Sequence, residues 1–326
     1  MSESFNSRVF GSVILRSINS NFNADFTNHP RTLPDGVVYS TDKALKYSIK
    51  DYLRKNYPDE KYMFVRTYNE NLNPRTLEES YEALFGEFPV ADKKSKKKDK
   101  EEFLRKEILR NLYKCIDIRL FGATFATGAN LSVHGVVQIN HGVNKFVAND
   151  IYTEDILSPF RNPSGEGSDE KERATIGNQT NLHEGHYVFH FSLNPKNSAQ
   201  DYEIINSLDD NEKLFLAASD ITKLKESLNR SVTYLDTSRK VGTENEATLW
   251  VQLKEDSRLV LPSFTELISV AQDRTIDFSL ASGVFNSIIE EVEIIELYYN
   301  PAYTKIAGIN KSDKVKFLNI LNGKEF

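Results

Sequence analysis

The chain has 326 residues, enough for one large domain, and its 39% hydrophobic, 11% aromatic and 27% charged residues are typical of a globular protein. Its 41 Lys and Arg residues against 47 Asp and Glu residues give a net charge of −6, so nucleic-acid binding would require positive charge to be concentrated locally. Cys115 is the only cysteine, which excludes an intramolecular disulfide and disfavours a zinc site built from cysteines. No segment resembles a membrane span or a signal peptide, so we expect a cytoplasmic protein without membrane contact.

The expected secondary structure is mixed and indicates an α+β fold, compatible with a ferredoxin-like sheet that carries large insertions. A Lys-rich run at 92–100 is expected to be a mobile, solvated insertion, with attraction of nucleic acid as the alternative. Residues 148–180, rich in Pro, Gly and charge, predict a long loop of a kind that is usually functional or disordered. In chain order we expect strands at 8–18, 61–68, 117–125, 131–141, 184–193, 247–254 and 287–299, and helices at 42–56, 77–85, 101–115 and 209–229.

The helix expected at 42–56 has one basic face. At 100° per residue its cations form a narrow row opposite an apolar face, so we expect them to point away from the core. A polyanion along this row would relieve the repulsion between like charges, although a solvated lysine surface is an alternative interpretation. The cations are Lys43, Lys46, Lys50 and Arg54, and the apolar residues are Leu45, Ile49, Tyr52 and Leu53.

Other segments give weaker signals for chemistry. His183, His186 and His190 are close in sequence, but His186 and His190 lie in an expected strand, where positions four apart are separated by roughly 13 Å. We therefore expect neither a metal site nor another cofactor. Asp25, in the polar loop after the first strand, is either a general acid or a turn residue. Residues 236–242 combine hydroxyls, two bases and a glycine, which suits either a phosphate grip or a plain surface turn.

Five segments together carry a resemblance to a known family. They are the Asn-rich loop at 19–25, the helix start at 40–46, the sequence DIRLFGA at 117–123, the sequence GVVQINHGVN at 135–144 and the sequence DTSRKVG at 236–242. In this order they resemble the Cas-seven backbone subunits of type I CRISPR surveillance complexes (Cascade), in particular the type I-B branch called Csh-two. The chain departs from the family pattern at Phe22 and Ala24, where Pro and Gly are usual, and in the permuted order of Thr-Ser-Arg-Lys.

The resemblance implies one domain spanning residues 1–326. It implies a ferredoxin-like (RRM-like) palm, an inserted helical finger region at about 70–115, and a flexible thumb hairpin at about 148–180. Copies would stack head to tail along the guide RNA (crRNA), and target DNA would be read by base pairing with that RNA. Partners would be the crRNA, other copies of the chain and other Cascade subunits, and the role would be non-catalytic and without a cofactor.

The resemblance also assigns a set of RNA contacts, and two alternatives stay open. Backbone subunits of the related type III complexes cut RNA with an Asp in the loop after the first strand, so Asp25 could make this chain a ribonuclease. A general single-stranded-RNA-binding RRM protein would need exposed aromatic residues on its sheet, whereas the face expected at 131–141 carries Ser, His, Val, Gln and Asn. The implied RNA-binding residues are Asn19, Asn21, Asn23, Ser40, Lys43, Lys46, Lys50, Arg54, Gln138, Asn140, Arg173, Ser238, Arg239 and Lys240.

Overall fold

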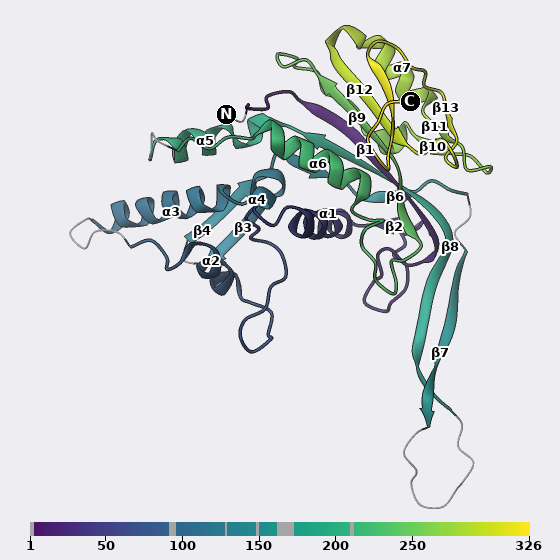
Figure 1. Cartoon of the computed structure of the whole chain (residues 1–326), viewed down its shortest axis with the longest axis horizontal. Coiled ribbons are helices and arrows are strands. Elements are labelled where there is room, and N and C mark those ends of the chain that lie inside the picture. Colours follow the sequence, from purple (N-terminus) through teal and green to yellow (C-terminus); the bar gives the residue numbers. More distant parts are fainter. Residues whose placement is uncertain (1–2, 91–95, 128, 148–149, 162–172, 209–211) are drawn as a thin grey trace, which may run out of the picture.

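The computed structural model describes residues 3–90, 96–127, 129–147, 150–161, 173–208 and 212–326, which form a mixed α/β structure around one large sheet (Figure 1). The strands are β1 (Val9–Ser20), β2 (Tyr39–Ser40), β3 (Gly122–Thr127), β4 (Ala129–His134), β5 (Val137–Ile139), β6 (Gly142–Asn144), β7 (Ile151–Arg161), β8 (Arg173–Leu193), β9 (Thr243–Leu253), β10 (Ser269–Val270), β11 (Ile276–Asp277), β12 (Val292–Tyr299), β13 (Ile306–Ala307) and β14 (Val315–Asn319). The helices are α1 (Asp42–Asn56), α2 (Leu77–Phe85), α3 (Lys97–Tyr113), α4 (Ile116–Phe121), α5 (Ala199–Asn206), α6 (Ala218–Arg230) and α7 (Ser279–Ser287), with short 3-10 turns η1 (Pro195–Ser198), η2 (Phe264–Glu266) and η3 (Ile289–Glu291). None of the helices in these described ranges has the length and apolar character that crossing a membrane requires.

The main sheet has the strand order β14-β12-β9-β1-β8-β6-β2, with β5 and β7 also paired to β8. The central strand β1 is antiparallel to both β8 and β9. Its residues Val13 and Leu15 pack against α1 and α6, whereas Phe10 and Ile14 pack against the C-terminal layer that contains α7. Both faces of β1 are therefore buried, as its two-sided apolar pattern predicts.

Helix α1 has the bounds predicted from its sequence. Thr41 is the N-cap, with its hydroxyl accepting a hydrogen bond from the N–H of Ala44 at 3.4 Å. Leu45, Ile49 and Leu53 are completely buried beneath the sheet, which confirms the apolar face and leaves the row of cations on the other side of the helix. The prediction of a helix at 77–85 is also confirmed by α2.

The strand predicted at 61–68 is wrong, and so is most of the strand predicted at 117–125. The backbone N–H groups of Met63 and Phe64 donate to the carboxylate of Asp117 at 3.0 and 2.7 Å, so they do not join a sheet. Asp117 itself lies in the helix α4 and not in a strand. The apolar residues on either side of it in the sequence are buried and recur at helical spacing. Only the end of the predicted strand is extended, as β3.

Other predicted elements exist with different bounds. The helix expected at 209–229 begins later, as α6, and the strand expected at 287–299 is preceded by the unpredicted helix α7. The strand expected at 131–141 is divided at Gly135, which packs against the backbone of α4: a Cβ atom there would lie 2.1 Å from the carbonyl carbon of Phe121. As a result β4 pairs with β3 and β5 pairs with β8.

Residues 148–180 do not form a structureless loop in their described part. β7 pairs with β8 from Ile151–Leu182 to Leu157–Thr175, and again at Arg161–Arg173, so the two strands make a ribbon that projects from the sheet (Figure 1). Hydrophobic alternation does not predict β7, because its described side chains are mostly exposed. A ribbon with little buried surface needs no apolar face. Residues 162–172, the rest of the predicted thumb, lie outside the described part of the chain.

A smaller unit of α2, α3, α4, β3 and β4 has its own core beside the main sheet. Tyr81 of α2 stacks on Phe88 at 4.4 Å between ring centres and lies 5.6 Å from Phe125 of β3. The predicted Lys-rich insertion leads into this unit, since residues 97–100 form the first turn of α3 and residues 91–95 are outside the described ranges. The unit lies on the same side of the sheet as α1 (Figure 1).

Candidate functional site

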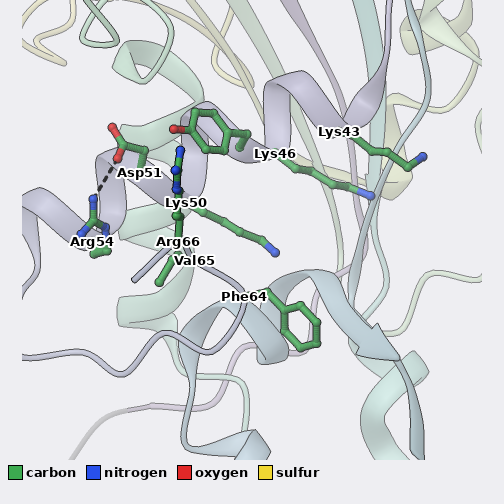
Figure 2. A pocket seen from close by; sticks show the side chains of 9 residues that line it. Lys43, Lys46, Lys50, Asp51, Arg54, Phe64, Val65 and Arg66 are labelled. Atoms are coloured by element: carbon green, nitrogen blue, oxygen red, sulfur yellow. Dashed lines mark hydrogen bonds and ion pairs between the residues drawn. The ribbon is translucent and has the colours of Figure 1, made fainter. Parts of the chain in front are cut away.

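The row of cations on α1 lines a pocket of about 340 Å³ (Figure 2). The opposite wall is the segment that follows α1, and Figure 2 shows the side chain of Lys50 extending toward Phe64 of this segment. The prediction that one face of α1 carries these cations is confirmed. The opposite wall contributes one more cation, Arg66. The lining residues are Lys43, Lys46, Tyr47, Lys50, Asp51, Arg54, Phe64, Val65 and Arg66.

Acids on α1 neutralise part of this row. Within the described part of the chain, Lys50 and Arg66 have no carboxylate within the 4.0 Å of an ion pair, unlike the other three cations of the pocket. An incoming anion therefore gains most from these two, because it displaces no existing ion pair there. The existing pairs are Lys43 with Asp42 at 3.5 Å, Lys46 with Asp42 at 3.1 Å and Arg54 with Asp51 at 3.2 Å.

Lys50 lies at the floor of the pocket. Its ammonium group is 5.6 Å from the ring centre of Phe64 and 5.8 Å from that of Phe121. Burial lowers the pKa of Lys50, the charge of Asp117 opposes this effect, and Lys46 adds to it. The expectation that Lys50 points away from the core is thus wrong, because the segment carrying Phe64 covers it. The Lys50 ammonium is half-buried and has no hydrogen-bond acceptor in the described part of the chain, so it is well suited to receive a phosphate oxygen.

Asp117 is the buried counter-charge behind Lys50. It is completely buried, and burial raises the pKa of its carboxyl, while Lys50 and the N–H groups of Met63 and Phe64 work in the opposite direction. By accepting both N–H groups, Asp117 fixes the segment that places Arg66 and Phe64 across from α1. A residue from the matched sequence DIRLFGA therefore shapes the pocket without lining it.

The Asn-rich loop after β1 holds the N-terminus of α1. The side-chain oxygen of Asn23 accepts hydrogen bonds from the N–H of Thr41 at 2.8 Å and from its hydroxyl at 2.9 Å. Asn21 is buried and donates to the carbonyls of Asn28 and Thr180, both at 3.1 Å. The side chains of Asn21 and Asn23, both predicted to bind RNA, are thus hydrogen-bonded within the protein. The outer surface of the loop remains for contact with a ligand.

Asn19 and Ser40 flank this loop. Asn19 is exposed, has a left-handed backbone with φ of 48°, and accepts a 3.3 Å hydrogen bond from the hydroxyl of Tyr152 at the base of the ribbon. Ser40 is buried, and its hydroxyl donates to the carbonyl of Thr41 at 3.4 Å. Of the two, Asn19 is therefore the one in contact with solvent.

Asp25 forms a turn. Its carboxylate accepts hydrogen bonds from the N–H and the hydroxyl of Thr27, both at 2.8 Å, and from the N–H of His29 at 3.0 Å. The hydroxyl of Thr27 is the main reason that the pKa of Asp25 is lowered, and the backbone N–H groups add to this. A carboxylate with a lowered pKa and three donors is a poor general acid, so the geometry favours the turn interpretation.

Residues 236–242 clamp the Asn-rich loop. The ammonium of Lys240 donates to the carbonyl of Phe22 at 2.5 Å and lies 4.6 Å from the ring centre of Phe22. Burial lowers the pKa of Lys240 to about 8. Arg239 donates to the side chain of Asn28 at 2.8 Å, and Ser238 is exposed. The two predicted phosphate-gripping bases are thus engaged in positioning the loop.

The remaining predicted residues lie away from the pocket. Gln138 is exposed and donates to the carbonyl of Gly135 at 3.0 Å. Asn140 is turned toward the C-terminal layer: it accepts from the N–H of His190 at 2.7 Å and donates to the hydroxyl of Thr265 at 3.2 Å. Arg173 begins β8, and its side chain is outside the described part of the chain.

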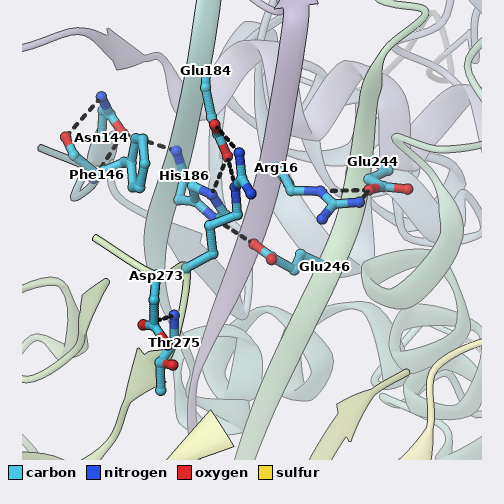
Figure 3. A network of polar contacts seen from close by, with 10 residues as sticks. Arg16, Asn144, Phe146, Glu184, His186, Glu244, Glu246, Asp273 and Thr275 are labelled. Carbon is cyan, nitrogen blue, oxygen red and sulfur yellow. Dashed lines mark hydrogen bonds and ion pairs between the residues drawn. The ribbon is translucent and has the colours of Figure 1, made fainter. Parts of the chain in front are cut away.

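The three histidines considered for a metal do not converge on one site. His186 is buried, and its ring nitrogens contact Glu246 at 2.6 Å and Glu184 at 3.3 Å, within the polar network of Figure 3. In the same network, on the C-terminal face of the sheet, Arg274 donates to Glu184 at 2.6 and 2.9 Å. His183 is exposed, and burial lowers the pKa of His190 to about 4.

The sequence does not predict the second wall of the pocket, which Phe64, Val65 and Arg66 form. Arg66 and Phe64 belong to a segment that was predicted to be a strand, and no periodic signal marks them as partners of α1. The available signal was local: Arg66 is a base in a segment that follows the basic helix after only a few residues. Pairing that segment with α1 required the long-range contact with Asp117.

Comparison with known proteins gives a family match over most of the chain. The model of the family described as CRISPR-associated protein Cas7 matches residues 7–282. A chain of a solved structure titled "CRISPR RNA-guided surveillance complex, pre-nicking" is similar in fold, with a TM-score of 0.51, 10% identity, and 96% of each chain covered. A chain of a "CRISPR RNA-guided surveillance complex" is similar with a TM-score of 0.47 and 11% identity, over 94% of this chain and 91% of that chain. A search of curated proteins gives no match.

Proposed function

Because the chain belongs to the Cas7 family of CRISPR-associated proteins, we propose that it is a non-catalytic backbone subunit that binds the guide RNA of a surveillance complex. In this proposal the complex is a type I Cascade, of the I-B branch, and acts in the cytoplasm. Copies of the chain bind along one crRNA beside the other Cascade subunits, and target DNA is recognised by pairing with that RNA.

The observation that carries the proposal is the pair of cations in the α1 pocket that have no acidic partner among the described residues. Lys50 of α1 and Arg66 of the segment across from it line the same cavity, and three paired cations extend the row along α1. Such a line of positive charge suits the evenly spaced phosphates of one strand, and it reconciles RNA binding with a net charge of −6. Phosphate contacts of this kind position a strand without reading its sequence.

The architecture supports a division of roles. We assign the strands around β1, with α1 and α6, to the ferredoxin-like palm, and the unit of α2 and α3 to the finger region. The ribbon of β7 and β8 is assigned to the thumb, which in this proposal meets the next copy on the RNA. The Asn-rich loop and residues 236–242 then border the RNA where the ribbon begins, since Asn19 contacts Tyr152.

The test is the salt dependence of binding between the full chain and a labelled single-stranded RNA. Removing one cation that neutralises a phosphate lowers the slope of log affinity against log salt by about 0.7. We expect Lys50→Met and Arg66→Met each to lower it by about that amount, and Lys50→Arg to restore it. The matched control is Lys305→Met, which removes an exposed lysine paired with Asp273 at 3.1 Å in the C-terminal layer. Slopes equal to that of the unmodified chain in both pocket variants would refute the proposal.

A further inference from the structure

A second pocket, of about 440 Å³, lies between the C-terminal ends of α1 and α6, β9 and the C-terminal segment of the chain. We call it the Asn229 pocket. None of the residues implied by the family resemblance lines it. The residues that matter for its chemistry are Asn229, Tyr234, Glu244 and Tyr303.

The lining of this pocket includes a largely buried amide whose oxygen has no partner among the described residues. Asn229 is 8% exposed, and its side-chain oxygen accepts no hydrogen bond from any described residue. Buried polar side chains are normally paired, so this amide is the group that a ligand would complete. The oxygen itself is buried, so rotation about the last side-chain bond, which exchanges the oxygen and the NH₂ group, is needed to turn it toward the pocket. The amide can thus offer either a donor or an acceptor to the polar edge of a ligand.

The walls of the pocket carry two half-exposed tyrosine rings. Tyr303 is 40% exposed, and the guanidinium of Arg16 lies 4.8 Å from its ring centre. Tyr234 is 43% exposed and is held edge-on by Tyr52 at 5.1 Å. Each ring is therefore fixed in place by a neighbour while part of it stays open. Fixed, accessible aromatic rings are platforms on which unpaired bases stack.

The pocket continues toward the Asn-rich loop. Thr233 and Glu244 line both the Asn229 pocket and a neighbouring one of about 370 Å³, which is bounded by Lys240 and Gly242. A strand that crosses residues 236–242 can therefore deliver one base into the Asn229 pocket without leaving the surface.

We propose that the Asn229 pocket binds one unpaired nucleobase, stacked on Tyr303 or Tyr234 and hydrogen-bonded through its edge to the amide of Asn229. When the base belongs to the bound guide strand, this inference rests on the proposed function. A free nucleoside offers the same chemistry. A peptide side chain is the less suitable occupant, because an apolar side chain would leave the buried amide unpaired.

The experiment uses photo-crosslinking with 4-thiouridine, whose base retains an N–H for the acceptor of Asn229. One arm uses a single-stranded RNA with this base at each position in turn, and the other uses the free nucleoside. Crosslinked peptides are mapped by mass spectrometry. We expect adducts at Tyr303 or Tyr234, a yield reduced about tenfold in Asn229→Leu, and a retained yield in Asn229→Asp, which keeps an acceptor. Phe103→Ala, which removes an aromatic residue of similar exposure (42%) on α3, is the control and should change nothing.

The outcomes separate this proposal from the proposed function. Adducts from the free nucleoside alone assign the pocket to a free nucleoside instead of the strand. If the strand binds with a salt slope that depends on Lys50 but no adduct forms in the pocket in either arm, the pocket proposal is overturned and the proposed function stands. If the strand does not bind, the proposed function fails and the nucleoside arm decides on the pocket. Protection of Tyr303 by a second copy of the chain without RNA, with no adduct in either arm, would identify a protein-docking surface.

Discussion

The side-chain oxygen of Asn23 accepts two hydrogen bonds from Thr41, one from the backbone N–H at 2.8 Å and one from the hydroxyl at 2.9 Å. Thr41 is at the same time the N-cap of α1. The loop after the first strand and the helix that carries the row of cations are therefore joined at one residue.

Loss of this junction should loosen the start of α1. We expect Asn23→Ala to lower the free energy of unfolding by about 1–2 kcal/mol, because two hydrogen bonds to the capping residue disappear. Asn23→Asp keeps an acceptor oxygen and should cost markedly less. Urea denaturation followed by circular dichroism measures both, and equal losses in the two variants would contradict the role assigned to the oxygen.

Gly242 tests how closely residues 236–242 approach β1. Its φ is +97°, and a Cβ atom there would lie 2.5 Å from the carbonyl oxygen of Ile18. Gly36 has a similar φ of +86°, but nothing lies within 4 Å of its Cβ position. Gly36→Ala should therefore cost only the backbone strain of about 1–2 kcal/mol. Gly242→Ala should cost clearly more, and comparable unfolding midpoints for the two variants would show that the loop can move away from β1.

Lys240 should give the chain a characteristic pH dependence. Burial lowers the pKa of Lys240 to about 8 from an ordinary value of 10.5, so between these values the unfolded chain binds the proton and the folded chain does not. The free energy of unfolding therefore rises with pH through this window, at about 1.4 kcal/mol per pH unit from this group. The cost of burying the charge is present below pH 8.

The measurement compares the unmodified chain with Lys240→Met at pH 7 and pH 9.5, since other titrating groups cancel in the difference. The advantage of the unmodified chain over the variant should grow by roughly 2 kcal/mol between the two pH values. A constant difference would mean that the ammonium of Lys240 titrates as it would in water.

The end of the ribbon can be tested by shortening it. Arg161 and Arg173 are opposite each other in the register of β7 and β8, so a two-residue Asn-Gly turn can replace residues 162–172. Because the strand pairing from Ile151 to Leu157 is retained, we expect the melting temperature of the single chain to stay within a few degrees of its original value. In the proposed function the same variant loses regular stacking along RNA, which electron microscopy would show. Ordered filaments of this variant would contradict the role of the thumb.

The sequence predicted the elements that depend on local signals. Helix α1 was predicted within its bounds because Thr41 caps it and its apolar residues recur at helical spacing. The strand at 61–68 was predicted wrongly because its N–H groups are bound by the carboxylate of Asp117, more than 50 positions away, and no local pattern records such a contact. The sequence therefore predicted one wall of the α1 pocket, and the second wall depended on the tertiary structure.

The same distinction explains residues 236–242. Their composition suggested a grip for phosphate, but a lysine side chain can bind an anion or a carbonyl, and the fold decides between them. In this chain Lys240 contacts the carbonyl of Phe22, a partner that lies far away in the sequence. Residue type predicted the polar chemistry of this loop, and only the geometry distinguished positioning from ligand contact.

The continuity of β8 has a mechanical consequence. One strand of 21 residues pairs with β1 inside the sheet and with β7 in the ribbon, so no hinge separates the two along its course. The part of β8 in the ribbon, from Arg173 to Leu182, spans roughly 30 Å at about 3.3 Å per residue. A sideways force on the end of the ribbon therefore bends β8, and this bending must strain the pairing between β8 and β1. Because β8 anchors the ribbon in the core, a force applied to the ribbon is transmitted to β1, the strand against which α1 packs.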